Sequence, residues 1–221
     1  MRQIAIDGPA GAGKSTIAKE ISRRLGFVYV DTGAMYRTLA LACLEAGADT
    51  NDEEAACRCC AAADIDIRYE GGAQEMYLAG RCVSGDIRRE DVGKAASQIA
   101  KYAGVRERLV AMQRHLGQEY DVVMDGRDIG TTVLPDADLK IYLTATVQCR
   151  AARRFRELEE KGTACDFDEI KKDIVARDLC DMTREISPLR QAEEAVVVDT
   201  SDMNIEEVAD KITGLFARKD M

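Results

Sequence analysis

The sequence predicts a doubly wound α/β fold with a five-stranded parallel sheet, on the basis of two observations. Strand-like apolar runs at 2–7, 27–30, 121–125, 138–143 and 195–199 each lead into a helical pattern, which is the alternation of a parallel sheet. Runs such as VVM and AVVVD are apolar without alternation, as expected where helices bury both faces of the sheet. We therefore expect a single domain over residues 1–221.

The first strand leads into GPAGAGKST at 8–16, which fits the pattern G-x-x-x-x-G-K-[ST]. Its glycines let backbone N–H groups turn inward around phosphates, where a side chain would obstruct. Lys14 is placed to reach the β- and γ-phosphates and the Ser15 hydroxyl to ligate Mg²⁺. The predicted triphosphate-binding residues are Gly8, Pro9, Ala10, Gly11, Ala12, Gly13, Lys14, Ser15 and Thr16. The loop leaves the acceptor of the terminal phosphoryl open: water, a protein side chain or a small molecule.

The ends of the next strands are also polar. The second ends in DTGAMYR and the third long strand in MDGRDIGT. Ligands of doubly wound sheets bind beyond the carboxyl ends of the strands, so Arg37 and Arg127 could bind a second phosphate group facing the loop. The alternative is that these residues only form helix caps and turns.

Two segments interrupt the alternation of strands and helices. Residues 64–85 are predicted to form a small β excursion with a turn at Gly71-Gly72. Residues 150–190 are long, charged, helical and rich in arginine, with a break around KGTACDF. Because phosphoryl transfer must exclude water, we expect this second segment to be a lid, with Gly162 in its break. A final helix has an apolar stripe formed by Ile205, Val208, Ala209, Ile212, Leu215 and Phe216.

Composition restricts the function classes. The 221 residues carry a net charge of −9, which argues against non-specific nucleic-acid binding. The sequence shows neither a signal-peptide layout nor an apolar run of membrane-spanning length, so no membrane association is expected. The eight cysteines are interpreted as reduced thiols of a cytoplasmic protein, and CRCC at 57–60 as helix packing rather than a zinc site.

What the sequence lacks narrows the chemistry further. It has no N-K-x-D motif for reading guanine, and its one histidine, His115, has no plausible serine or cysteine partner for nucleophilic catalysis. Phosphoryl transfer to a bound small molecule needs mainly positioning and charge neutralisation, provided that the acceptor brings its own phosphate oxygen. The residues described above are sufficient for that chemistry.

At this point the chain resembles the bacterial cytidylate kinase family of nucleoside monophosphate kinases. The resemblance spans nearly the whole chain and rests, in order, on IDGPAGAGKST, DTGAMYR, VSGDIRREDVGKAASQIA, VRERL, DGRDIGT, PDADLKIYLTA and ARDLCDMTR. It implies a P-loop kinase domain with a monophosphate-binding insert at 64–100 and a lid at 150–190. It also implies transfer of the γ-phosphoryl of ATP to CMP or dCMP with Mg²⁺.

The resemblance assigns roles to individual residues. It implies that Lys14, Arg127 and Arg184 are catalytic and that Arg153, with Arg154 beside it, lies near the donor adenine. The implied CMP-binding residues are Ser97, Arg106 and Asp128 at the base, Lys14, Arg37, Arg127 and Arg184 at the phosphate, and Arg177 and Asp181 at the sugar. Thr32 and Tyr36 complete the implied set. The chain departs from the family at Cys180 and Met182, where many relatives have arginines.

Two other functions stay open on the sequence alone. One is a different small-molecule kinase of the adenylate or shikimate type, and the other is a nucleotide-binding regulatory module with little turnover. The partners expected are the nucleotides ATP and CMP or dCMP, and the expected assembly is a monomer. ATP turnover with and without CMP separates these possibilities.

Overall fold

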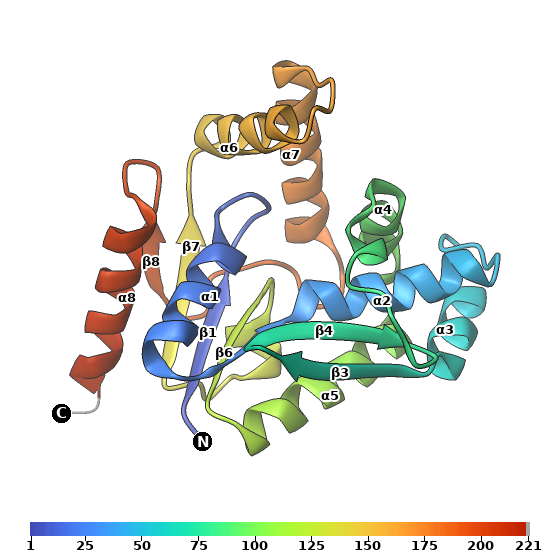
Figure 1. Cartoon of the computed structure of the whole chain (residues 1–221), viewed down its shortest axis with the longest axis horizontal. Coiled ribbons are helices and arrows are strands. Elements are labelled where there is room, and N and C mark those ends of the chain that lie inside the picture. The colour runs from blue at the N-terminus through green and yellow to red at the C-terminus, as the bar shows by residue number, and fades with distance from the viewer. Residues whose placement is uncertain (220–221) are drawn as a thin grey trace.

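A computed structural model describes residues 1–219. Its central sheet is parallel and five-stranded, in the order β2-β6-β1-β7-β8, which confirms the predicted fold class (Figure 1). The strands are β1 (Gln3–Asp7), β2 (Val28–Asp31), β3 (Ile65–Glu70), β4 (Ala73–Leu78), β5 (Arg81–Cys82), β6 (Val122–Gly126), β7 (Leu139–Thr144) and β8 (Val196–Asp199). The α-helices are α1 (Lys14–Leu25), α2 (Thr32–Glu45), α3 (Glu53–Ala62), α4 (Glu90–Ile99), α5 (Ala103–Glu119), α6 (Val147–Glu160), α7 (Phe167–Thr183) and α8 (Ile205–Lys219).

Helices cover both faces of the inner strands of the central sheet, as their unbroken apolar sequences predict. The prediction is wrong for the edge strand β8, where Val197 is 47% exposed and only Val198 is fully buried. Successive side chains of a strand point to opposite faces, so Ile4 and Ile6 pack with α1 and α8 on one side. Ala5 joins a second apolar cluster with α2, α4 and α5 on the other side. Both faces of β1 are therefore buried, and only the ends of the strands are free to carry polar chemistry.

The apolar stripe predicted for α8 is correct except at its first residue. Val208, Ala209, Ile212 and Phe216 are buried against the sheet. Ile205 is 50% exposed, because it begins the helix at the rim of the cavity described below, beyond the end of the sheet.

The predicted β excursion is a separate antiparallel sheet in the order β3-β4-β5. Gly71 and Gly72, both with positive φ, form the tight turn between β3 and β4. The inner residues of this sheet, Met76 and Leu78, join the same apolar cluster as α2, and β4 runs alongside that helix (Figure 1). The small sheet is thus attached to the face of the central sheet that α2 covers.

Residues 147–183 form two helices, α6 and α7, that extend beyond the carboxyl ends of the strands (Figure 1). They pack on each other through a small apolar cluster of their own, centred on Ala151, Ile170 and Ile174. The break at 161–166 contains Gly162 with φ +69, as the sequence predicts for this region. Within residues 1–219, no helix combines the length and the hydrophobicity that crossing a membrane requires.

The CRCC cysteines lie on α3 and pack against α2. Cys60 is buried, with its Sγ 3.7 Å from that of Cys43, and Cys57 and Cys59 are partly buried in the same cluster. Packing is therefore the observed role of this segment. The expectation that it binds no zinc stays a prediction.

Gly8 lies very close to the backbone of a neighbouring strand. It follows β1 with φ +151, and a Cβ there would lie 1.9 Å from the carbonyl oxygen of Leu143 in the neighbouring β7. A backbone oxygen in a central sheet cannot move aside. Only glycine fits between β1 and the phosphate loop.

We expect Gly8→Ala to lower the free energy of unfolding by at least about 3 kcal/mol, since overpacking and backbone strain act together. The control is Gly47→Ala, because Gly47 also has positive φ (+67) but open space around it and should cost only about 1 kcal/mol. Urea denaturation measures both. Equal losses would show that the contact with Leu143 is unimportant.

Candidate active site

The loop between β1 and α1 is shaped to surround an anion. Gly11 and Gly13 both adopt positive φ, and Gly13 stands immediately before the first turn of α1. This conformation turns backbone N–H groups inward next to a helix N-terminus, where the helix dipole also favours negative charge. The loop therefore has the geometry that its sequence pattern predicts.

Lys14 lies at the base of this loop and is 6% exposed. Its Nζ donates to the carbonyl oxygen of Pro9 at 2.8 Å. Burial, followed by the nearby Arg127 guanidinium, lowers the pKa of Lys14 to about 7. An ammonium in this environment gains strongly from an added anion, because neighbouring negative charge would favour its protonated form.

Ser15 points to the end of β6. Its Oγ lies 3.1 Å from Oδ2 of Asp125, and the other oxygen of that carboxylate accepts from the Tyr29 hydroxyl at 2.8 Å. Asp125 is buried, which raises its pKa. A hydroxyl and a carboxylate oxygen side by side are hard oxygen donors of the kind that Mg²⁺ prefers.

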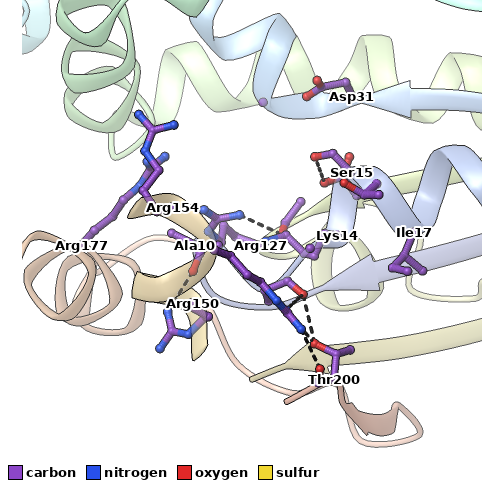
Figure 2. A pocket seen from close by; sticks show the side chains of 18 of the residues that line it. Ala10, Lys14, Ser15, Ile17, Asp31, Arg127, Arg150, Arg154, Arg177 and Thr200 are labelled. Carbon is purple, nitrogen blue, oxygen red and sulfur yellow. Dashed lines mark hydrogen bonds between the residues drawn. The ribbon is translucent and has the colours of Figure 1, made fainter. Parts of the chain in front are cut away.

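Arg150 connects the phosphate loop to the two helices above it. The guanidinium is almost fully buried and donates to the carbonyl oxygen of Ala10 at 2.9 Å (Figure 2). It also donates to the carbonyl oxygen of Ala145 at 3.0 Å. Its third contact is an ion pair with Asp178 of α7 at 2.7 Å. One side chain thus joins the loop, the end of β7 and α7.

Arg153 lies one turn further along α6. It donates to the side-chain and backbone oxygens of Thr200, at 3.0 and 2.6 Å, and approaches the Ala12 carbonyl at 3.4 Å. The structure therefore places Arg153 next to the phosphate loop, with Thr200 beside it in the loop after β8.

The N-terminus of α2 forms the opposite wall. The Asp31 side chain caps the helix by accepting from the Ala34 N–H at 2.8 Å, and Thr32 Oγ1 donates to the Asp125 carbonyl at 2.7 Å. Arg37 lies one turn into the helix, with a guanidinium nitrogen 3.6 Å from Asp31. Its Nε is buried and has no hydrogen-bond partner within residues 1–219, which suits a side chain that receives an anion.

A buried charge cluster lies further from the loop. Asp128 accepts from Arg106, with both residues about 5% exposed, and from Arg184 at 3.4 Å. The Tyr36 ring lies 5.9 Å from the Arg106 guanidinium carbon. These residues come from α2, α5, the end of β6 and the segment after α7, so four parts of the chain meet in this cluster.

A second ion pair stands between this cluster and the loop. Arg127 Nε donates to Asp181 of α7 at 2.7 Å. Burial alone would raise the pKa of Asp181, but the Arg127 charge holds it below its ordinary value. Burial and the same Arg127 lower the pKa of Arg177. Cations are thus crowded here beyond what the local carboxylates balance.

Residues of the phosphate loop, of the first turns of α2, of α6 and of both charged groups around Asp128 and Asp181 line one cavity of about 1370 Å³. Nine arginines and Lys14 face seven carboxylates around it, although the whole chain has a net charge of −9. Of the residues predicted from the sequence, the cavity is lined by Ala10, Gly11, Ala12, Gly13, Lys14, Ser15, Thr16, Thr32, Tyr36, Arg37, Ser97, Arg106, Arg127, Asp128, Arg153, Arg177, Asp181 and Arg184. Gly8 and Pro9 lie outside this lining and shape the loop from behind.

Sequence reasoning missed several polar residues at this end of the sheet. Asp125 follows an apolar strand directly, a signal that could have identified it. Arg150 was noticed only as one of several arginines in the charged segment, and Thr200 gave no local signal, because their contacts are with segments far away in the chain.

Comparison with known proteins agrees with this geometry. The family model described as cytidylate kinase matches residues 4–218. The chain belongs to the cytidylate kinase family. A cytidylate kinase of Lactobacillus johnsonii is 47% identical over 99% of this chain and 95% of its own length, and one of Caldicellulosiruptor saccharolyticus is 49% identical over 96% and 94%. This member of the family is therefore a kinase.

Solved structures of more distant proteins share the fold of this cytidylate kinase family member. A shikimate kinase from Bacteroides thetaiotaomicron has a TM-score of 0.52 at 14% identity and covers 98% of both chains. An uncharacterized protein from Eubacterium ventriosum has a TM-score of 0.54 at 12% identity, covering 98% of this chain and 99% of its own. At such low identity the likeness concerns the fold alone.

Asp7 supports the site without lining the cavity. Its two carboxylate oxygens accept from the backbone N–H groups of Ile129 and Gly130, at 2.7 and 2.8 Å. These N–H groups open the single π-helical turn Ile129–Val133 that follows Asp128. Burial outweighs the hydrogen bonds and raises the pKa of Asp7 to about 6.

The raised pKa makes a prediction about stability. Below pH 3.8, the ordinary pKa of an aspartate, Asp7 is protonated in both the folded and the unfolded protein and does not disfavour folding. As the pH rises from there to about 6, the unfolded protein loses this proton more readily than the folded protein, so the free energy of unfolding decreases. The shift corresponds to about 3 kcal/mol. Between pH 4 and 7, the unfolding free energy of the wild type minus that of Asp7→Asn should fall by about this amount.

Urea denaturation at several pH values measures this difference. Asp168→Asn, an exposed carboxylate on α7, is the control for the removal of one negative charge. A difference between wild type and Asp7→Asn that does not vary with pH would contradict the raised pKa.

Proposed function

We propose that this protein transfers the γ-phosphoryl group of ATP to CMP or dCMP, giving ADP and CDP or dCDP. One observation carries the proposal. A single cavity joins the phosphate loop to the buried Arg106–Asp128 pair, with the Arg127–Asp181 pair between them. This order suits a triphosphate at one end, a base at the other and two facing phosphates in the middle. Family membership supports the same reaction.

The donor half is assigned to the phosphate loop. Residues 8–16 would hold the phosphates of ATP, with Lys14 neutralising charge on the γ-phosphoryl group as it transfers. Arg153 would lie near the donor nucleotide. Mg²⁺ fits beside Ser15 and Asp125, and when bound it would neutralise phosphate charge and align donor and acceptor oxygens.

The acceptor half is assigned to residues from the opposite wall and from α7. Arg37, Arg127 and Arg184 would bind the CMP phosphate, and Arg127 and Arg184 would also stabilise the charge that develops during transfer. Arg177 and Asp181 would contact the sugar. Thr32 and Tyr36 would line the passage to the base.

Base selection is assigned to Ser97, Arg106 and Asp128. Arg106 and Arg184 fix the orientation of the Asp128 carboxylate, whose two oxygens offer about four lone-pair positions and can still accept another hydrogen bond. Cytosine presents an amino donor to such a carboxylate, and its ring acceptors can face Arg106. Uracil presents an oxygen instead, which the carboxylate repels.

The two accessory segments would act as a monophosphate-binding insert at 64–100 and a lid at 150–190. The placement of α6 and α7 beyond the strand ends, with Arg150 and Arg153 touching the loop, supports closure over bound nucleotides. A lid would exclude water and limit wasteful hydrolysis of ATP.

The proposal includes the setting in which the kinase works. We infer a cytoplasmic monomer that acts on nucleotides and not on nucleic acid. All eight cysteines are free thiols, which suits a reducing compartment, and the net charge of −9 disfavours nucleic-acid binding. Sedimentation at micromolar concentration tests the monomer.

An assay of ATP consumption tests the reaction itself. With Mg²⁺ present, CMP should raise the rate at least about a hundredfold over ATP alone, with CDP formed in equal amount to ADP, since a kinase that excludes water hydrolyses ATP slowly. AMP, UMP and shikimate serve as competing acceptors. Faster turnover with AMP or shikimate, or equal rates with and without CMP, would refute the proposal.

The role of Asp128 is tested by Asp128→Asn. We expect kcat/KM for CMP to fall far more than kcat/KM for UMP, narrowing their ratio by at least about tenfold, because the carboxylate both attracts cytosine and repels uracil. The variant should also melt at a lower temperature, since Arg106 loses its buried partner.

The matched control for Asp128→Asn is Asp178→Asn. It breaks the other buried arginine pair, with Arg150, so it also lowers stability but should leave the ratio of CMP to UMP unchanged. If both variants change the ratio alike, Asp128 does not read the base.

A further inference from the structure

The small antiparallel sheet touches the central sheet at a point next to the acceptor half of the cavity. β2 is an edge strand of the central sheet, and the backbone N–H and C=O groups of its last residue, Asp31, point away from the neighbouring strand β6. Gln74 of β4 meets both of them. Its Oε1 accepts from the Asp31 N–H at 2.8 Å, and its Nε2 donates to the Asp31 carbonyl at 3.2 Å.

One side-chain amide therefore replaces a missing strand partner. An amide offers an acceptor and a donor side by side, as a peptide group does, so it can pair with both backbone groups of one edge residue. Gln74 Nε2 also lies 3.1 Å from the sulfur of Met76, whose buried side chain holds β4 against α2. The amide is thus fixed from its own strand as well as from β2.

Asp31 is also the residue from which α2 starts. Its side chain caps the helix at Ala34 and lies 3.6 Å from Arg37. The next residue, Thr32, bonds to the Asp125 carbonyl at the end of β6. Fixing the backbone of Asp31 therefore fixes the first turn of α2, from which Thr32, Tyr36 and Arg37 line the cavity.

We propose that Gln74 is a positioning residue for the phosphoryl acceptor. It would tie the antiparallel sheet to the edge of β2 and so hold the first turn of α2 in the orientation that receives the acceptor monophosphate. Gln74 is not itself among the residues that line the cavity, and it acts through Asp31. This inference rests on the proposed function, because it assigns the α2 wall to the acceptor.

The test compares Gln74→Met and Gln74→Glu with the wild type. Methionine keeps the length of the side chain but loses both hydrogen bonds, and glutamate keeps the acceptor but turns an oxygen toward the Asp31 carbonyl. We expect each variant to raise KM for CMP about tenfold, the effect of one net hydrogen bond, with KM for ATP within about twofold of wild type and kcat little changed.

The control is Gln191→Leu, which removes a side-chain bond from an exposed glutamine to the backbone of Ala195. Its kinetic constants should equal those of the wild type. A structural role alone for Gln74 would lower the melting temperature and the active fraction without a selective change in KM. Unchanged KM for CMP, or equal rises for CMP and ATP, would overturn the proposal.

Equilibrium titration of CMP covers the case of a poorly folding variant, since the dissociation constant of the folded fraction does not depend on its amount. The dissociation constant for CMP should rise about tenfold in any Gln74 variant that retains some folded protein, and an unchanged constant would overturn the proposal. If the wild-type protein neither binds CMP nor phosphorylates it, the proposed function is refuted instead. The same comparison of KM values with the acceptor actually used would then still decide the role of Gln74.

Discussion

The pairing of buried positive charge is the constraint on which the rest of this structure depends. Lys14, Arg106 and Arg150 are each no more than 6% exposed, and a cation removed from water is costly unless oxygen atoms surround it. Pro9, Asp128 and Asp178 supply those oxygens. Because cation and partner come from different elements, satisfying each charge also fixes where α5, α6 and α7 lie relative to the sheet.

The same pairs prepare the cavity for phosphate. Fixed donors that point toward developing charge stabilise it more than mobile ones, since they need no reorganisation when the reaction occurs. The carboxylates beside the arginines reduce the electrostatic repulsion between the cations that are gathered in this site. They leave an excess of positive charge where phosphates would meet, inside a chain whose net charge is −9.

The positions of two accessory parts depend on polar contacts as well as on apolar packing. Arg150 holds α7 to the phosphate loop, and Gln74 holds the antiparallel sheet to the edge of β2. The apolar cluster between α6 and α7 is small and separate from the main core, so the position of these helices depends strongly on such contacts.

The sequence by itself determined the five strands, the phosphate loop, the β excursion and the two charged helices, because each is encoded in a local pattern of apolar and glycine residues. The phosphate-loop motif and the family resemblance identified 18 of the 39 residues that line the cavity. Only the tertiary structure decided that Asp7 holds the turn after Asp128, 122 residues away, and that Arg150 bonds to Ala10 across 140 residues. The physical reason is that these polar groups pair with whichever segments the fold brings next to them. The spacing of the residues along the chain does not indicate which segments those are.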